Sequence, residues 1–159
     1  MELELAQALG HFGWLRGEDL PKVAQRLVED GFDDPTACEL AALHHPTLRD
    51  AGPLFLRILR QLGKPTLSVA EAREIATRHF AEAIVAGTVA PRDGADRLTA
   101  LFDASDRPKE LEVFWELWAN YDDGPGGTGG QEAFNAGIDA RVIAEARTLL
   151  ATRRTPAKP

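Results

Sequence analysis

The recurrence of apolar side chains every three or four residues constrains the fold of this chain more than any other feature of its sequence. This spacing places them on one face of an α-helix. Between Leu48 and Leu62, for example, Ala51, Phe55 and Ile58 share such a face. No stretch alternates apolar and polar residues, and no hairpin turn lies between β-rich segments. The sequence therefore predicts an all-α protein, a compact bundle or stacked helical hairpins of about seven to eight helices.

Start and stop signals divide the chain into eight expected helices. Ser68 and Glu71 fit a capping box, and Asp19 is the expected N-cap of the second helix. Pro53 is expected to kink the fourth helix or to confine its regular part to residues beyond Gly52. The expected helices cover residues 2–9, 20–30, 35–45, 48–62, 69–86, 91–102, 107–121 and 131–152.

Glycine and chain length set the expected domain organisation. The chain has 159 residues, a size typical of one domain. Residues 122–130 are rich in glycine, which favours a flexible loop over a regular element. We expect a single helical domain over residues 1–152 that contains this loop, and a disordered tail over residues 153–159.

Charge and cysteine content narrow the classes of function. The formal net charge is −7, which disfavours binding to nucleic acid or to anionic membranes, because both depend on Lys and Arg meeting phosphate. The start of the chain is acidic, and no apolar run approaches the roughly 20 residues that cross a bilayer. Cys38 is the only cysteine, and its apolar neighbours suggest a small core residue. We expect a cytoplasmic protein without internal disulfides.

His44, His45 and His79 are the weak candidates for metal ligands. None of them lies in an HExxH or ExxH pattern, in which a histidine shares a helix face with its partner ligand. His44 and His45 are expected to cap the end of a helix, and His79 to be a partly buried structural residue. The sequence predicts no catalytic residue, no metal site and no cofactor.

Two charged surfaces remain as candidates for binding. One is an acidic ridge on the helix over residues 107–121 and just beyond it, formed by Glu112, Glu116, Asn120, Asp122 and Asp123. The ridge is either a docking surface for a basic protein or the solvated face of a helix whose aromatic stripe lies in the core. Exposure of Trp115 or Trp118 would favour docking, because exposed aromatic residues beside charge are typical of protein contacts.

The second surface is a short basic strip of Arg57, Arg60, Gln61 and Lys64. Such a strip can hold a phosphate or an acidic peptide, or it can simply keep the outer face of a helix soluble. It has no recognition-helix pattern for DNA.

Residues 83–98, followed by Leu111 to Asp123, carry an Ala-rich helix, a Gly-x-x-x-Pro turn, an Asp-Gly-Ala helix start and an aromatic, acidic end. This passage resembles small all-α bacterial proteins of uncharacterised function, some of which resemble immunity proteins of toxin systems. The resemblance implies a non-enzymatic protein-binding module that inhibits a basic toxin. A helical small-ligand-binding or regulatory domain, and an enzyme with a site around the histidines, are the alternatives.

Overall fold

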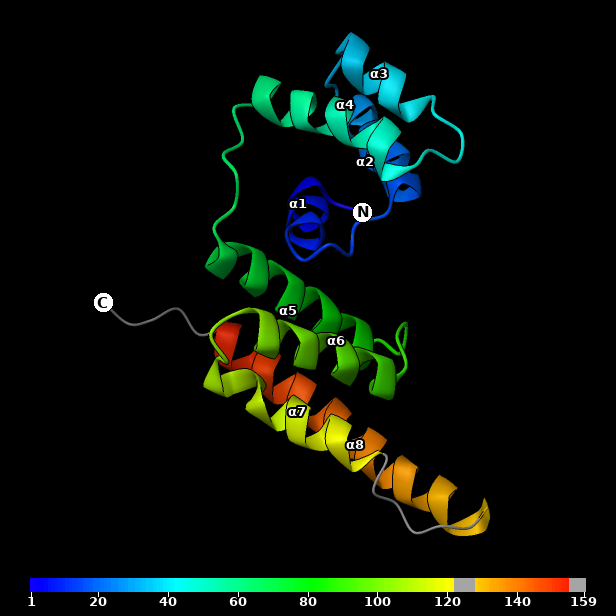
Figure 1. Cartoon of the computed structure of the whole chain (residues 1–159), viewed down its shortest axis with the longest axis vertical. Coiled ribbons are helices and arrows are strands. Elements are labelled where there is room, and N and C mark those ends of the chain that lie inside the picture. The colour runs from blue at the N-terminus through cyan, green and yellow to red at the C-terminus, as the bar shows by residue number, and fades with distance from the viewer. Residues whose placement is uncertain (122–127, 155–159) are drawn as a thin grey trace, which may run out of the picture. The chain divides into compact units, whose positions relative to one another are not determined.

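A computed structural model describes residues 1–121 and 128–154, and over these residues the protein is all-helical (Figure 1). The all-α prediction is therefore confirmed for the described part of the chain. Its elements are α1 (Leu3–His11), the 3₁₀ helix η1 (Gly17–Asp19), α2 (Leu20–Glu29), α3 (Pro35–Ala41), α4 (Leu48–Gln61), α5 (Val69–Val85), α6 (Pro91–Ala104), α7 (Lys109–Asn120) and α8 (Thr128–Arg154).

The chain divides into two compact units, and the boundary falls inside helix α5. Unit 1 comprises residues Met1–Ile75 and unit 2 comprises residues Ala76–Pro159. Each unit is described by itself below. The single domain expected over residues 1–152 stays a prediction.

Unit 1 is built from α1, η1, α2, α3 and α4. Helix α2 packs against α3, α3 packs against α4, and η1 contacts both α2 and α4. The fully buried side chains of Leu20, Leu40 and Ile58 come from three of these helices and form part of the core. Gln61 at the end of α4 donates a hydrogen bond to the carboxylate of Asp34 at the start of α3, at 2.9 Å. This bond ties the two helices together at the surface.

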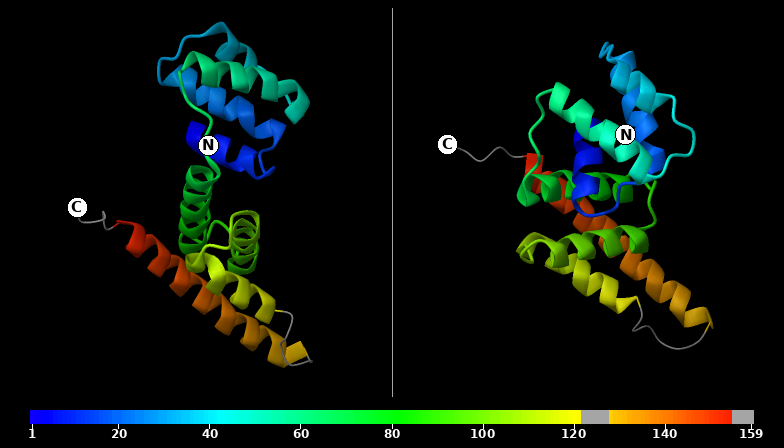
Figure 2. Two further views of the ribbon diagram at one scale, coloured as in Figure 1. Left: turned by 60° about the vertical axis from the view of Figure 1, so that its left-hand side comes forward. Right: turned by 45° about the horizontal axis from the view of Figure 1, so that its top comes forward.

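Unit 2 contains α6, α7, α8 and the second half of α5. Helix α6 packs against α7, both contact α8, and α8 runs alongside α7 (Figure 2). The core includes the fully buried side chains of Leu98, Leu111, Phe114 and Val142, which come from all three helices. Each helix thus buries one stripe of its surface, as the helical periodicity of the sequence requires.

Two helix starts show how local sequence sets the elements. The backbone amide and the hydroxyl of Ser68 both donate to the Glu71 carboxylate, at 2.8 and 2.7 Å, and the Glu71 amide donates to the Ser68 hydroxyl at 3.2 Å. The predicted capping box is confirmed. Asp50 accepts in the same way from the amide and hydroxyl of Thr47, at 3.1 and 2.6 Å, so α4 has a second such start that the sequence analysis missed.

The structure corrects part of what was expected of Pro53 and Asp19. Pro53 lies inside α4, which starts at Leu48 and is not confined to residues beyond Gly52. Pro53 and Arg49 are both exposed, so water can bond the Arg49 carbonyl that loses its helical partner. Asp19 is the N-cap residue of α2, as expected, but it is also the last residue of η1 and its side chain makes no capping bond to α2.

The expected loop and tail also need correction at their edges. Helix α8 begins at Thr128 and ends at Arg154. The last three residues of the expected loop, 128–130, and the first two of the expected tail, 153–154, are therefore helical. Residues 122–127 and 155–159 lie outside the described residues. No helix in the described ranges is long and apolar enough to span a membrane.

Gly17 allows the backbone of η1 to lie close to the start of α4. A Cβ atom on Gly17 would lie 2.2 Å from the carbonyl carbon of Thr47 and 2.4 Å from the carbonyl oxygen of Pro46. Both atoms belong to the backbone, so a larger residue would push η1 away from the start of α4. Gly52, inside α4, is the opposite case, because its Cβ would meet only the Leu48 side chain, at 4.0 Å.

We expect Gly17→Ala to lower the free energy of unfolding by about 1–3 kcal/mol, the usual cost of overpacking. Gly52→Ala should raise it by about 0.5–1 kcal/mol, because alanine favours the helix and here meets no obstacle. Urea unfolding followed by far-ultraviolet circular dichroism measures both changes. Equal stability of the two variants would contradict the close approach at Gly17.

Candidate functional site

The buried stripe of α7 determines which of its side chains face outward. Leu111, Phe114 and Leu117 are fully buried against the rest of unit 2, and Tyr121 just beyond the helix is 3% exposed. Because these residues follow one another at intervals of three or four, residues at positions 112, 115 and 116 must lie toward the opposite side. The sequence left open whether the aromatic stripe that contains Trp115 and Trp118 lies in the core.

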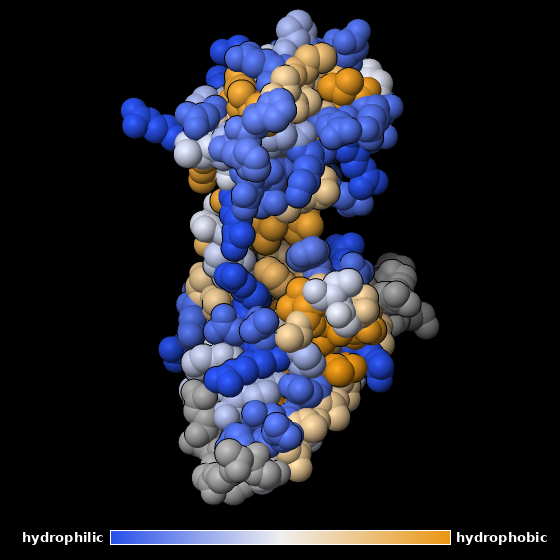
Figure 3. All heavy atoms as spheres, turned by 90° about the vertical axis from the view of Figure 1, so that its right-hand side faces the viewer, coloured by the Kyte–Doolittle hydropathy of each residue, from blue (hydrophilic) through white to orange (hydrophobic). Residues whose placement is uncertain are grey.

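Trp115 is in fact 45% exposed, and Trp118 is half-buried. Glu112 and Glu116 are exposed on either side of Trp115, three residues before it and one after it. Figure 3 shows one face of the molecule, on which patches of hydrophobic residues lie among hydrophilic ones. We call Glu112, Trp115 and Glu116 the acidic aromatic surface.

The predicted acidic ridge has three further members, Asn120, Asp122 and Asp123. The side-chain amide of Asn120 donates to the backbone carbonyl of Glu116 at 2.8 Å, so this amide group is engaged by its own helix. Asp122 and Asp123 lie outside the described residues. The part of the ridge that the structure shows in solvent is therefore formed by Glu112 and Glu116.

Tyr121 joins the end of α7 to the two neighbouring helices. Its hydroxyl donates to the carboxylate of Asp139 on α8 at 2.5 Å, and the guanidinium of Arg92 on α6 lies 5.4 Å from the centre of its ring. Burial raises the pKa of the Tyr121 hydroxyl, and the bond to the Asp139 carboxylate raises it further. Asp139 lies 18 residues further along the chain, and no pattern in the sequence predicts its contact with Tyr121.

The raised pKa of Tyr121 predicts that unit 2 loses stability above about pH 10, the ordinary tyrosine pKa. In that range the unfolded chain releases the phenol proton while the folded chain retains it, so deprotonation favours unfolding. Tyr121 is the only tyrosine, so tyrosinate absorbance reports on this group alone. We expect the absorbance to rise near pH 10 in denaturant and at clearly higher pH in the folded protein. Coincident titrations would contradict the buried hydrogen bond.

The histidine candidates lie in different surroundings in the two units. His44 and His45 are exposed and follow α3, which already ends at Ala41, so they do not cap that helix as expected. His79 is half-buried on α5, as expected. Burial lowers the pKa of His79, and the nearby Glu82 carboxylate partly opposes this. Within residues 1–121 and 128–154 no group of three or more His, Cys, Asp or Glu side chains could hold a metal ion.

Cys38 is exposed on α3, so its assignment to the core is wrong. The buried positions of this short helix are Thr36, Ala37 and Leu40. Cys38 follows Ala37 by one residue, a rotation of about 100° around the helix, which turns it toward solvent.

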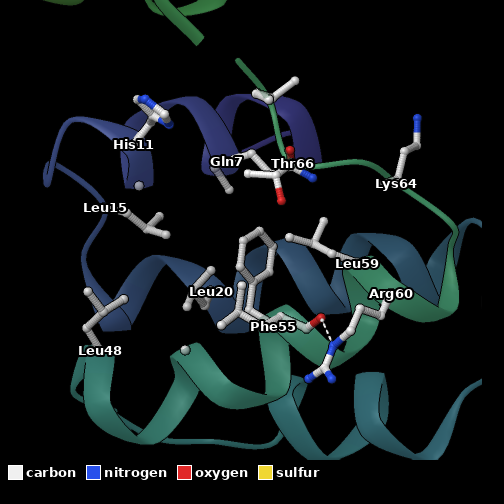
Figure 4. A pocket seen from close by; sticks show the side chains of 15 residues that line it. Gln7, His11, Leu15, Leu20, Leu48, Phe55, Leu59, Arg60, Lys64 and Thr66 are labelled. Atoms are coloured by element: carbon white, nitrogen blue, oxygen red, sulfur yellow. Dashed lines mark hydrogen bonds between the residues drawn. The ribbon is translucent and has the colours of Figure 1, made fainter. Parts of the chain in front are cut away.

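A pocket of about 560 Å³ opens in unit 1 between α1, α4 and the segment that follows α4 (Figure 4). All of its lining residues belong to unit 1. Its walls are mainly apolar and include Leu15, Leu20, Leu48, Phe55, Leu59 and Leu67. Arg60 and Lys64 lie at one end of the pocket and His11 lies at the other. The sequence analysis found the basic strip that contains Arg60 and Lys64, but not the pocket.

Comparison with known proteins gives no relative for this chain. No family model matches it, no curated protein matches it, and no solved structure matches it. The arguments for function therefore rest on the described surfaces.

Proposed function

We propose that this protein is a non-enzymatic protein-binding module, and that it binds a basic partner through the acidic aromatic surface. The observation that carries the proposal is the exposure of Trp115 between Glu112 and Glu116. A tryptophan in this setting offers a large apolar contact area, which is removed from water only when a partner covers it. The two carboxylates add electrostatic attraction for a partner of opposite charge.

The acidic composition and the resemblance of residues 83–98 and 111–123 support a finer proposal. In it, the protein acts in the bacterial cytoplasm as an immunity-type inhibitor that covers the functional surface of a basic toxin. A compact bundle, or stacked helical hairpins, would hold such a surface rigid in this protein. A rigid surface lowers the entropic cost of binding. Because Leu111, Phe114 and Leu117 anchor α7 in its core, Trp115 extends from a helix that is fixed on its opposite side.

The proposal predicts different effects for the aromatic and the acidic residues. Trp115→Ala should weaken partner binding by roughly thirtyfold or more, mainly through faster dissociation, because it removes a central apolar contact. The double variant Glu112→Lys, Glu116→Lys should slow association and reduce the salt dependence of its rate. Affinity capture from a native lysate, followed by surface plasmon resonance with the purified partner, measures both effects.

A matched control separates the local surface from the overall charge. Glu39→Lys, Glu132→Lys makes the same change in net charge at exposed positions on α3 and α8. This control should retain the partner, and circular dichroism should show that every variant keeps its helices. If the Glu112, Glu116 double variant and Trp115→Ala both bind the partner as tightly as the unmodified protein, the acidic aromatic surface is not the binding site.

A further inference from the structure

The pocket of unit 1 combines an apolar wall with a charged end, and helix α4 supplies both. Leu48, Gly52, Leu56 and Arg60 follow one another at intervals of four residues, so they form one row along the helix. All four line the pocket. Leu48 is 47% and Leu56 57% exposed, although both are large apolar side chains. The row is about 18 Å long, from the rise per residue of an α-helix, and ends in a cation.

Gly52 leaves space in the middle of this row. Glycine inside a helix costs stability relative to alanine, and no turn or positive φ requires it here. A Cβ atom at this position would meet only the Leu48 side chain, at 4.0 Å, so the space beside the backbone of α4 is open to the pocket. An extended ligand can therefore approach the helix closely between the two exposed leucines.

The charged end of the pocket retains the capacity to bind an anion. The Nε atom of Arg60 donates to the backbone carbonyl of Leu56 at 3.2 Å, which holds the side chain beside the pocket (Figure 4). The Lys64 ammonium lies 3.2 Å from the carboxylate of Glu4 on α1. A carboxylate that meets the remaining guanidinium nitrogens of Arg60 would gain a charge-assisted hydrogen bond.

We propose that the pocket of unit 1 binds a fatty carboxylate, a single acyl chain with one anionic head group. The acyl chain lies along Leu48, Gly52 and Leu56 over the side chains of Phe55 and Leu59, and the carboxylate meets Arg60. Because the walls are mainly apolar, they suit an acyl chain better than a sugar or a nucleotide, many of whose polar groups would lose their hydrogen bonds to water.

Isothermal titration calorimetry with octanoate, decanoate and dodecanoate below their micelle concentrations tests the site in the full chain. Affinity should rise roughly tenfold for each two added methylenes, because each one buries further apolar surface. Decan-1-ol should bind about tenfold more weakly than decanoate. Equal affinity for the alcohol and the acid, or no heat from dodecanoate, overturns the proposal.

Variants locate the ligand within the pocket. Gly52→Leu fills the open space in the row and should weaken dodecanoate binding at least tenfold, while leucine, a good helix former, preserves α4. Arg60→Gln should weaken the binding of decanoate but not of decan-1-ol. His11→Gln, at the opposite end of the pocket, is the matched control and should change neither affinity. Unchanged dodecanoate affinity in Gly52→Leu, with its helicity intact, places the ligand elsewhere and overturns the proposal.

A vesicle experiment distinguishes a free fatty acid from an acyl chain in a membrane. The proposal expects no co-sedimentation of the protein with phosphatidylglycerol vesicles and direct binding of dodecanoate in solution. Co-sedimentation without binding of the free acid would overturn it in favour of a membrane surface. This site is independent of the acidic aromatic surface, because Gly52→Leu changes unit 1 and Trp115→Ala changes unit 2.

Discussion

The burial of Leu111, Phe114 and Leu117 decides which side chains of α7 can meet a partner. A helix has one period, so fixing these three residues in the core fixes the direction of every other residue on it. Glu112, Trp115 and Glu116 then face outward together, although the sequence analysis had divided them between a polar ridge and an apolar stripe. The exposure of Trp115 is therefore a consequence of core packing. Tyr121 supports the same arrangement at the end of the helix, because its hydroxyl and ring contact α8 and α6.

Much of the fold could be predicted because its signals are local. The Ser68 and Glu71 capping box depends on residues three positions apart, and the sequence contains all of that information. Confinement of α4 to residues beyond Gly52, one of the two effects expected of Pro53, was wrong for the opposite reason. The cost of Pro53 depends on whether the carbonyl one turn earlier can reach water, which only the exposure of Arg49 reveals. The start of α8 was also misplaced, because glycine disfavours a helix without forbidding it.

The candidate sites were harder to predict because they depend on contacts between distant residues. The sequence identified Glu112 and Glu116 correctly as exposed acids, since charged residues on one helix face are seldom buried. The sequence did not show whether Trp115 or Leu117 is buried, because both residues lie within the apolar stripe of α7. The pocket had no sequence signal at all, since α1 and α4 approach each other only in the folded unit. Gly52 was the nearest clue, as a helical glycine with no turn to explain it.

The two candidate sites are opposite in character, which the net charge of the chain conceals. The acidic aromatic surface is solvated, so its carboxylates act on an approaching partner through water and are screened by salt. The pocket is concave and mainly apolar, and its cations act over the length of a hydrogen bond. Salt should therefore affect the two sites unequally, and an excess of acidic residues over the whole chain does not exclude a local site for an anion. The arrangement of individual residues on helix faces, more than overall composition, determines what each unit can bind.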